Sequence, residues 1–250
     1  MLKVFIGYDE RQPISYQVLH YSILKYASVP VSITPLVLNT LPIKRVGLTP
    51  FTYSRFLVPL LCDYQGSALF LDADMLLTDD IKKLFDHFDP ECDVSVVKNT
   101  KRFEWASVML FNNEKCKVLT PEYIENGTGL HTITWANKIG DIPAEWNFLS
   151  GYDEKPAELP KLIHYTQGLP CFPEMKKVDY NEQWLNTHSE MNSAKSWTEL
   201  MGPSVHAVEV NGVRLPKYLF DFNRNPVMPF KHFDETVKEL LHVDTWRDGV

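Results

Sequence analysis

Apolar and polar positions fall into blocks that alternate between two periods along the first part of the chain. Residues 3–8 and 31–38 form short apolar runs that are typical of strands. Residues 13–26 and 52–64 instead place apolar side chains at helical spacing, and we expect Pro59 to kink the second of these helices. A third apolar run ends at Leu71. This order predicts an α/β fold with parallel strand pairs.

The pattern is less regular toward the C-terminus. A capping segment at residues 78–80 predicts a helix that ends near residue 88. Further elements are expected as strands at 92–98, 105–111 and 161–164, and as helices near 129–138 and at 233–241. Residues 171–250 are rich in Pro, Asn and aromatic side chains. We therefore assign residues 1–170 to the core and 171–250 to a more irregular extension packed on it within a single domain.

Two acids interrupt the third apolar run, in the segment LFLDADML at residues 69–76. Asp72 and Asp74 are two positions apart, which places both side chains on the same side of a strand. Ligands of open α/β sheets bind at this carboxyl end of the strands, and paired carboxylates suit Mg²⁺ or Mn²⁺. The alternative is local: Asp74 starts a turn and Asp72 accepts backbone hydrogen bonds. The apolar flanks favour the metal.

Composition limits the classes of partner. The 250 residues carry a net charge of −7, which argues against nucleic acid because that partner requires a basic face. No run of roughly 18 apolar residues is present, so we expect no transmembrane segment. The N-terminus begins as a strand rather than a signal peptide, and four widely spaced cysteines show no CxxC pair. Reduced core cysteines and a cytoplasmic protein are therefore expected.

Four segments resemble GT-A-fold glycosyltransferases, nearest to family 8, the galactosyltransferase and glycogenin group. They are KVFIGYDERQPISYQVLHYSI, TYSRFLVPLL with SALFLDADMLL, IPAEWNFL, and LIHYTQG. Their order and spacing fit that family, and together they cover roughly residues 1–170. The resemblance implies a Rossmann-like mixed sheet flanked by helices, a UDP-sugar donor, a divalent cation, and transfer of a hexose with retention to a carbohydrate or other hydroxyl acceptor.

The resemblance also implies particular site residues. Asp72, Asp74 and His164 correspond to the metal ligands, with Mn²⁺ expected and Mg²⁺ as the alternative, because imidazole suits borderline metals. Asp9 is placed to accept a hydrogen bond from uracil N3–H. The full set assigned to nucleotide-sugar binding is Tyr8, Asp9, Arg11, Arg55, Asp72, Ala73 and Gly168.

The residue pattern itself offers a plainer interpretation of several of these residues. Arg55 lies opposite the apolar stripe of its helix, so periodicity alone predicts a solvated side chain, and only the resemblance turns it inward. Asp9 is also suited to cap the following helix. A single histidine after an apolar strand, such as His164, is more often a structural hydrogen-bonding residue than a ligand.

The second half departs from the family pattern. Trp105 stands where the family usually carries asparagine, and LHTITWANKIGD lacks the usual acidic cluster. The catalytic carboxylate is therefore left open among Glu104, Asp141 and Glu145, and residues 171–250 are assigned to the acceptor side. Two other functions fit the acid pair: a phosphatase of the haloacid-dehalogenase type, and a module that binds a nucleotide or glycan without transfer.

Overall fold

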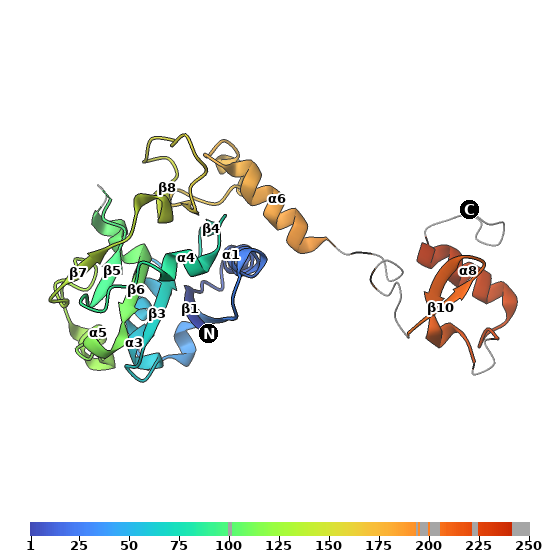
Figure 1. Cartoon of the computed structure of the whole chain (residues 1–250), viewed down its shortest axis with the longest axis horizontal. Coiled ribbons are helices and arrows are strands. Elements are labelled where there is room, and N and C mark those ends of the chain that lie inside the picture. The colour runs from blue at the N-terminus through green and yellow to red at the C-terminus, as the bar shows by residue number, and fades with distance from the viewer. Residues whose placement is uncertain (100–101, 194, 196–199, 201–205, 222–224, 242–250) are drawn as a thin grey trace. The chain divides into compact units, whose positions relative to one another are not determined.

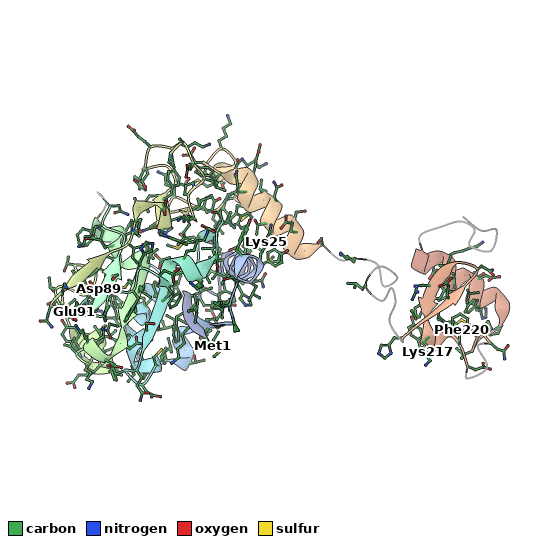
Figure 2. All side chains as sticks on the ribbon, in the orientation of Figure 1. Met1, Lys25, Asp89, Glu91, Lys217 and Phe220 are labelled. Carbon is green, nitrogen blue, oxygen red and sulfur yellow. The ribbon has the colours of Figure 1, made fainter. Side chains whose placement is uncertain are left out.

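The computed structural model (Figure 1) describes residues 1–99, 102–193, 195, 200, 206–221 and 225–241. Its contacts divide the chain into two compact units, Met1–Met191 and Asn192–Val250. Side chains fill the space between the elements within each unit (Figure 2). Within the described residues, no helix has both the length and the apolar character needed to cross a membrane.

A six-stranded mixed sheet forms the centre of the first unit, in the order β2-β1-β3-β6-β5-β7. β1 pairs in parallel with β2 and β3, β6 is antiparallel to β3 and β5, and β7 is parallel to β5. Consecutive residues of β3 and β6 are buried, so both faces of the sheet are covered. The predicted α/β class with a mixed sheet is thereby confirmed. The strands are β1 (Leu2–Gly7), β2 (Val31–Leu36), β3 (Ser67–Leu71), β5 (Val94–Val96), β6 (Val108–Asn112) and β7 (Ile139–Asp141).

The helices follow the sequence pattern closely at first and then less so. Helix α1 (Pro13–Tyr26) has the predicted bounds. The helix predicted at 52–64 forms as α2 (Phe51–Ser54), a 3-10 turn (Arg55–Leu57) and α3 (Val58–Leu61). Pro59 explains the interruption, because it lacks the N–H that would bond to the carbonyl one turn earlier. Side chains of Asp80 and Thr120 cap α4 (Ile81–Phe85) and α5 (Pro121–Asn126).

A second, three-stranded sheet lies beyond the C-terminal end of β3. Its order is β4-β9-β8, with β9 antiparallel to β4 and parallel to β8. The strands are β4 (Met75–Leu77), β8 (Phe148–Leu149) and β9 (Leu162–His164). Val18 of α1, Leu76, Ile163 and Trp184 of α6 (Asn181–Asn192) form a core between these elements. Helix α6 therefore ties residues beyond 170 to the first unit.

The second unit has its own small core. An antiparallel hairpin joins β10 (Ala207–Val210) to β11 (Val213–Pro216) through Asn211 and Gly212, both with positive φ, as a two-residue hairpin turn requires. Helix α8 (Phe230–Leu241) confirms the predicted C-terminal helix. Leu215, Leu219, Phe220, Phe233 and Val237 form the core. The packing of this segment on residues 1–170 stays a prediction.

Two expectations from the sequence are wrong. Residues 129–138 form turns rather than a helix, because Gly129 and Ile133 have positive φ values that interrupt helical hydrogen bonding. Cys171 is exposed, whereas the other three cysteines are buried as expected.

Candidate metal and donor site

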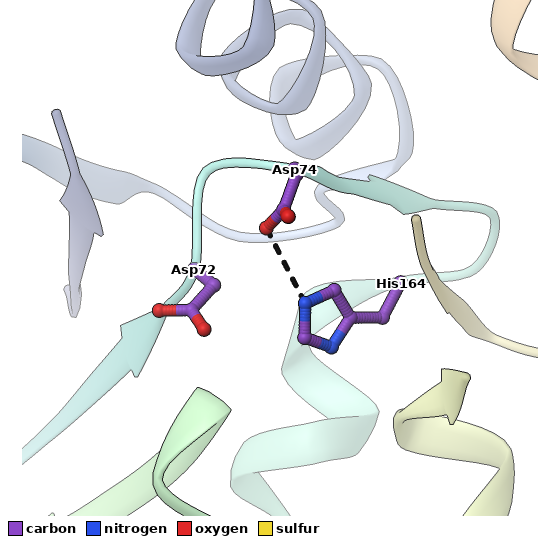
Figure 3. A group of neighbouring side chains, drawn as sticks. All are labelled: Asp72, Asp74 and His164. Atoms are coloured by element: carbon purple, nitrogen blue, oxygen red, sulfur yellow. Dashed lines mark ion pairs between the residues drawn. The ribbon is translucent and has the colours of Figure 1, made fainter. Parts of the chain in front are cut away.

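Strand pairing brings the two acids and a distant histidine together. β3 ends at Leu71 and β4 begins at Met75, so Asp72 and Asp74 lie in the connection between the two sheets. The register of β4 and β9 places His164 opposite Met75, beside Asp74. One possible ligand atom from each of Asp72, Asp74 and His164 lies within 4.8 Å of the others, and Figure 3 shows the three side chains converging.

His164 is oriented through both ring nitrogens. Nδ1 lies 3.1 Å from the amide oxygen of Asn147, and Nδ1 is the donor in a hydrogen bond between them because that oxygen only accepts. Nε2 then faces a carboxylate oxygen of Asp74 at 3.3 Å (Figure 3). This arrangement is typical of metal-binding histidines, whose second nitrogen is held by an acceptor. Sequence reasoning gave Asn147 no role, since no local pattern signals a contact across 17 residues.

Arg55 is buried beneath the acid pair. One guanidinium nitrogen lies 2.9 Å from Oδ1 of Asp72, and both side chains are at most 10% exposed. The guanidinium also donates to the carbonyl oxygen of Ala106 at 2.7 Å. The solvated position predicted from periodicity is wrong, because α-helical spacing stops where the 3-10 turn begins at Arg55. The inward orientation is the one that the family resemblance implied.

The electrostatics of the triad reflect burial and mutual interaction. Burial raises the pKa of Asp72 to about 6, with Arg55 opposing the shift and Asp74 adding to it. For His164, burial lowers the pKa, but the carboxylates of Asp74, Asp72 and Glu104 outweigh burial and leave the pKa raised. Without a bound cation, the triad therefore retains protons at a higher pH than isolated groups would.

The three candidate catalytic carboxylates occupy different surroundings. The Glu104 side chain is 13% exposed, accepts a hydrogen bond from the Ser107 hydroxyl at 2.5 Å, and lies 3.8 Å from Nδ1 of His164. Asp141 and Glu145 are more exposed and form ion pairs with Lys98 and Lys161 at 2.9 and 2.6 Å. Of the three, Glu104 is therefore the carboxylate placed beside the triad.

The predicted nucleotide residues lie at the same edge of the sheet. β1 is parallel to β2 and β3, so the residues after Gly7 and those after Leu71 share one edge. Tyr8 lines a cavity of about 410 Å³ together with residues 37–39 that follow β2. Asp9 is buried, whereas Arg11, which contacts it at 2.6 Å, is largely exposed. The hydrogen bond from Arg11 holds the pKa of Asp9 below its usual value.

The other two residues predicted to bind the nucleotide sugar, Ala73 and Gly168, have no polar side chain. Ala73 is buried between Asp72 and Asp74. Gly168 follows β9 in a turn closed by its N–H and the carbonyl oxygen of Tyr165 at 2.9 Å. Its φ of +135° is a region that favours glycine, which explains the glycine of the LIHYTQG segment.

The residues present fit a divalent cation. Two ligands of one cation at about 2.1–2.5 Å are at most about 4–5 Å apart, and the three ligand atoms all lie within 4.8 Å of one another. Two carboxylates and one imidazole suit Mn²⁺ and related borderline ions. Within the described residues, this is the group of His, Cys, Asp and Glu side chains that could hold a metal.

Solved structures with the same fold are glycosyltransferases. Glycosyltransferase GlyE of Streptococcus pneumoniae superposes with a TM-score of 0.57 at 17% identity, covering 76% of this chain and 61% of GlyE. Galactosyltransferase LgtC, solved with donor and acceptor sugar analogues, gives 0.53 at 12% identity, covering 78% and 98%. The bifunctional glycosyltransferase WbbM gives 0.55, and this chain spans 51% of it. These likenesses establish the fold.

The protein thus has the GT-A glycosyltransferase fold, with an Asp-Asp-His triad at the strand edge. No protein-family profile matches the sequence. Protein CDI of Arabidopsis thaliana is 38% identical over 227 residues, covering 76% of this chain and 87% of the relative. The chain belongs to the Protein CDI family.

Proposed function

We propose that this protein is a metal-dependent glycosyltransferase that moves a sugar from a nucleotide-sugar donor to a hydroxyl acceptor. The observation that carries the proposal is the convergence of Asp72, Asp74 and His164 at the carboxyl edge of a GT-A sheet. Glycosyltransferases with the same fold, including a galactosyltransferase solved with sugar analogues, support it. The GT-A fold argues against the haloacid-dehalogenase alternative.

The finer proposal is a UDP-hexose donor, Mn²⁺ and retention. Asp72, Asp74 and His164 would hold the cation, which would supply charge neutralisation for the departing diphosphate. Arg55 keeps Asp72 in place and balances its charge. Asn147 holds His164 in the tautomer that leaves Nε2 as an acceptor. Glu104 accepts a hydrogen bond from Ser107 and lies 3.8 Å from Nδ1 of His164, so its negative charge acts on the imidazole.

Uridine recognition is assigned to Asp9. A carboxylate has about four acceptor positions, and Arg11 contacts both oxygens of Asp9 through its backbone and side chain. The Arg11 side chain is 68% exposed, so it has room to move when uracil N3–H approaches. Cytosine lacks this N–H, and a purine is larger than the pyrimidine for which the site is proposed.

Calorimetric titration with UDP, GDP and CDP, each with Mn²⁺ and with chelator, tests the donor. We expect UDP to bind most tightly and only with metal. Hydrolysis of UDP-glucose and UDP-galactose to UDP then separates a transferase from a binding module. Tighter GDP binding would overturn uridine specificity, whereas binding of UDP without turnover of any UDP-sugar would overturn the enzymatic assignment.

A further inference from the structure

Asn147, which contacts His164, also lines a second cavity. It measures about 390 Å³ and lies among the end of β5, the 3-10 turn Ala144–Trp146 and the loop before β9. This volume falls in the range of roughly 300–1,000 Å³ found for small-molecule sites. The cavity belongs entirely to the first unit, and the mechanism above does not use it.

The Asn147 side chain lies between the cavity and the triad. It lines the cavity, while its side-chain oxygen contacts Nδ1 of His164 and its side-chain nitrogen donates to the carbonyl oxygen of Glu104 at 3.4 Å. His164 in turn faces Asp74 at 3.3 Å. A molecule in the cavity is therefore separated from the triad by one side chain.

The lining combines apolar surface with acidic charge. Phe148 and Leu159 provide apolar surface, and Leu159 is 48% exposed. Two lysines and four carboxylates line the cavity, which gives a net charge of −2. Both lysines are already paired, Lys161 with Glu145 and Lys98 with Asp141. This lining suits a polyhydroxylated ring with an apolar face and disfavours a phosphate or carboxylate.

We propose that this cavity binds the acceptor, and that the acceptor is a neutral or amine-bearing saccharide rather than an acidic or phosphorylated one. The proposal rests on the proposed glycosyltransferase function and adds its second substrate class. Leu159 packs against the apolar face of the ring, and Asn147 lies between the site and the triad.

The test measures binding of three probes by ligand-observed NMR to protein saturated with UDP and Mg²⁺. The probes are methyl α-D-glucopyranoside, glucosamine and glucose 6-phosphate. We expect the first two to bind weakly and the phosphate not to bind. Replacing Mg²⁺ with Mn²⁺ should broaden the resonances of the bound probes, because the paramagnetic ion lies near them.

Variants locate the site. Leu159→Ala should weaken binding of the neutral probe about two- to tenfold, because it removes the apolar surface on which the ring packs. Leu24→Ala, which trims a comparably exposed leucine on α1, is the matched control and should bind like the wild type.

Two kinds of failure are distinguishable. If UDP binds with metal but neither neutral nor aminated probe binds, or if Leu159→Ala binds the probes like the wild type, the acceptor proposal is wrong. Binding of glucose 6-phosphate as tight as that of the glucoside would also overturn it. If UDP fails to bind with any divalent metal, the donor assignment fails instead, and the proposed function fails with it.

Discussion

Arg55 and Asp72 form a buried ion pair, with a guanidinium nitrogen 2.9 Å from Oδ1 of the carboxylate. The same guanidinium donates to the carbonyl oxygen of Ala106, so it connects the segment after α2 with the strand edge that carries the acids. Burial raises the pKa of Asp72 even beside this cation. Arg55 is therefore the positive charge that offsets the cost of burying Asp72 before any metal binds.

Removing that charge should destabilise the fold. Arg55→Met leaves Asp72 buried without its partner, which costs about 3–5 kcal/mol at neutral pH for pairs of this kind. Urea unfolding measures the loss, which should shrink at acid pH because Asp72 then takes up a proton. Mn²⁺ should stabilise the variant more than the wild type. Lys82→Met, at the exposed pair with Asp86, is the control and should change little; equal losses in the two variants would contradict the argument.

Asp74→Asn should sharply weaken Mn²⁺-dependent UDP binding and leave the fold intact. The Asp74 side chain is 31% exposed and its ion-pair partner is His164, which can release its proton when Asp74 loses its charge, so no unpaired buried charge remains. Calorimetry with and without Mn²⁺ measures the effect. Asp79→Asn removes a nearby acid of similar exposure that pairs with Lys83 on the surface, and it should bind like the wild type. Unchanged affinity in Asp74→Asn would refute the metal assignment.

His164→Gln should narrow the preference for Mn²⁺ over Mg²⁺. Imidazole favours the borderline ion, whereas an amide oxygen suits both cations. The ratio of UDP affinities in the two metals is the readout, together with donor turnover, which should fall by orders of magnitude. Near-normal turnover of His164→Gln with Mn²⁺ would show that His164 has a structural role and is not a metal ligand.

Asn147→Ala should have a different effect from His164→Gln, because Asn147 contacts the ring of His164 rather than the cation. Loss of an outer partner typically lowers metal affinity about 10- to 100-fold. Because His164 itself remains, the preference for Mn²⁺ over Mg²⁺ should persist. A variant that loses the preference as His164→Gln does would show that Asn147 does more than orient the ring.

Mn²⁺ affinity of the nucleotide-free protein should fall as the pH falls through about 6. Metal binding requires Asp72 ionised and His164 neutral, so protons compete with the cation. The pKa of Asp72 is raised to about 6 and that of His164 is also raised, so this competition begins at a higher pH than for isolated groups. Titration of Mn²⁺ by electron paramagnetic resonance across this range is the measurement; pH-independent affinity would count against the triad.

His131 should make the protein less stable in mild acid. Its ring packs on Tyr53 and Phe56, and burial, with Arg55 adding to it, lowers its pKa from 6.5 to about 4. Between these two pH values, His131 binds a proton in the unfolded chain but not in the native protein. Its contribution to the free energy of unfolding is therefore fully present above pH 6.5 and is lost as the pH falls toward 4. In urea unfolding, the free energy of unfolding of His131→Gln should fall less steeply with decreasing pH than that of the wild type. An unchanged pH dependence would show that other groups cause the loss of stability in acid.

Local chemistry alone determined much of this protein. The apolar runs, the helical spacing of residues 13–26 and the acids after β3 predicted α1, the parallel strands and the paired carboxylates, because each depends on side chains that are close in sequence. The hairpin at Asn211 and Gly212 also had a local signal, the Asn-Gly pair, which sequence reasoning did not use.

Tertiary structure decided the remaining parts of the site. Periodicity placed Arg55 in solvent, whereas the 3-10 turn and the buried charge of Asp72 turned it inward. The family resemblance suggested His164, but only the register of β4 against β9 sets it beside Asp74. Asn147 acquires its position from contacts with Glu104 and His164, which are distant from it in sequence. Such contacts depend on strand register and burial, which no local pattern records.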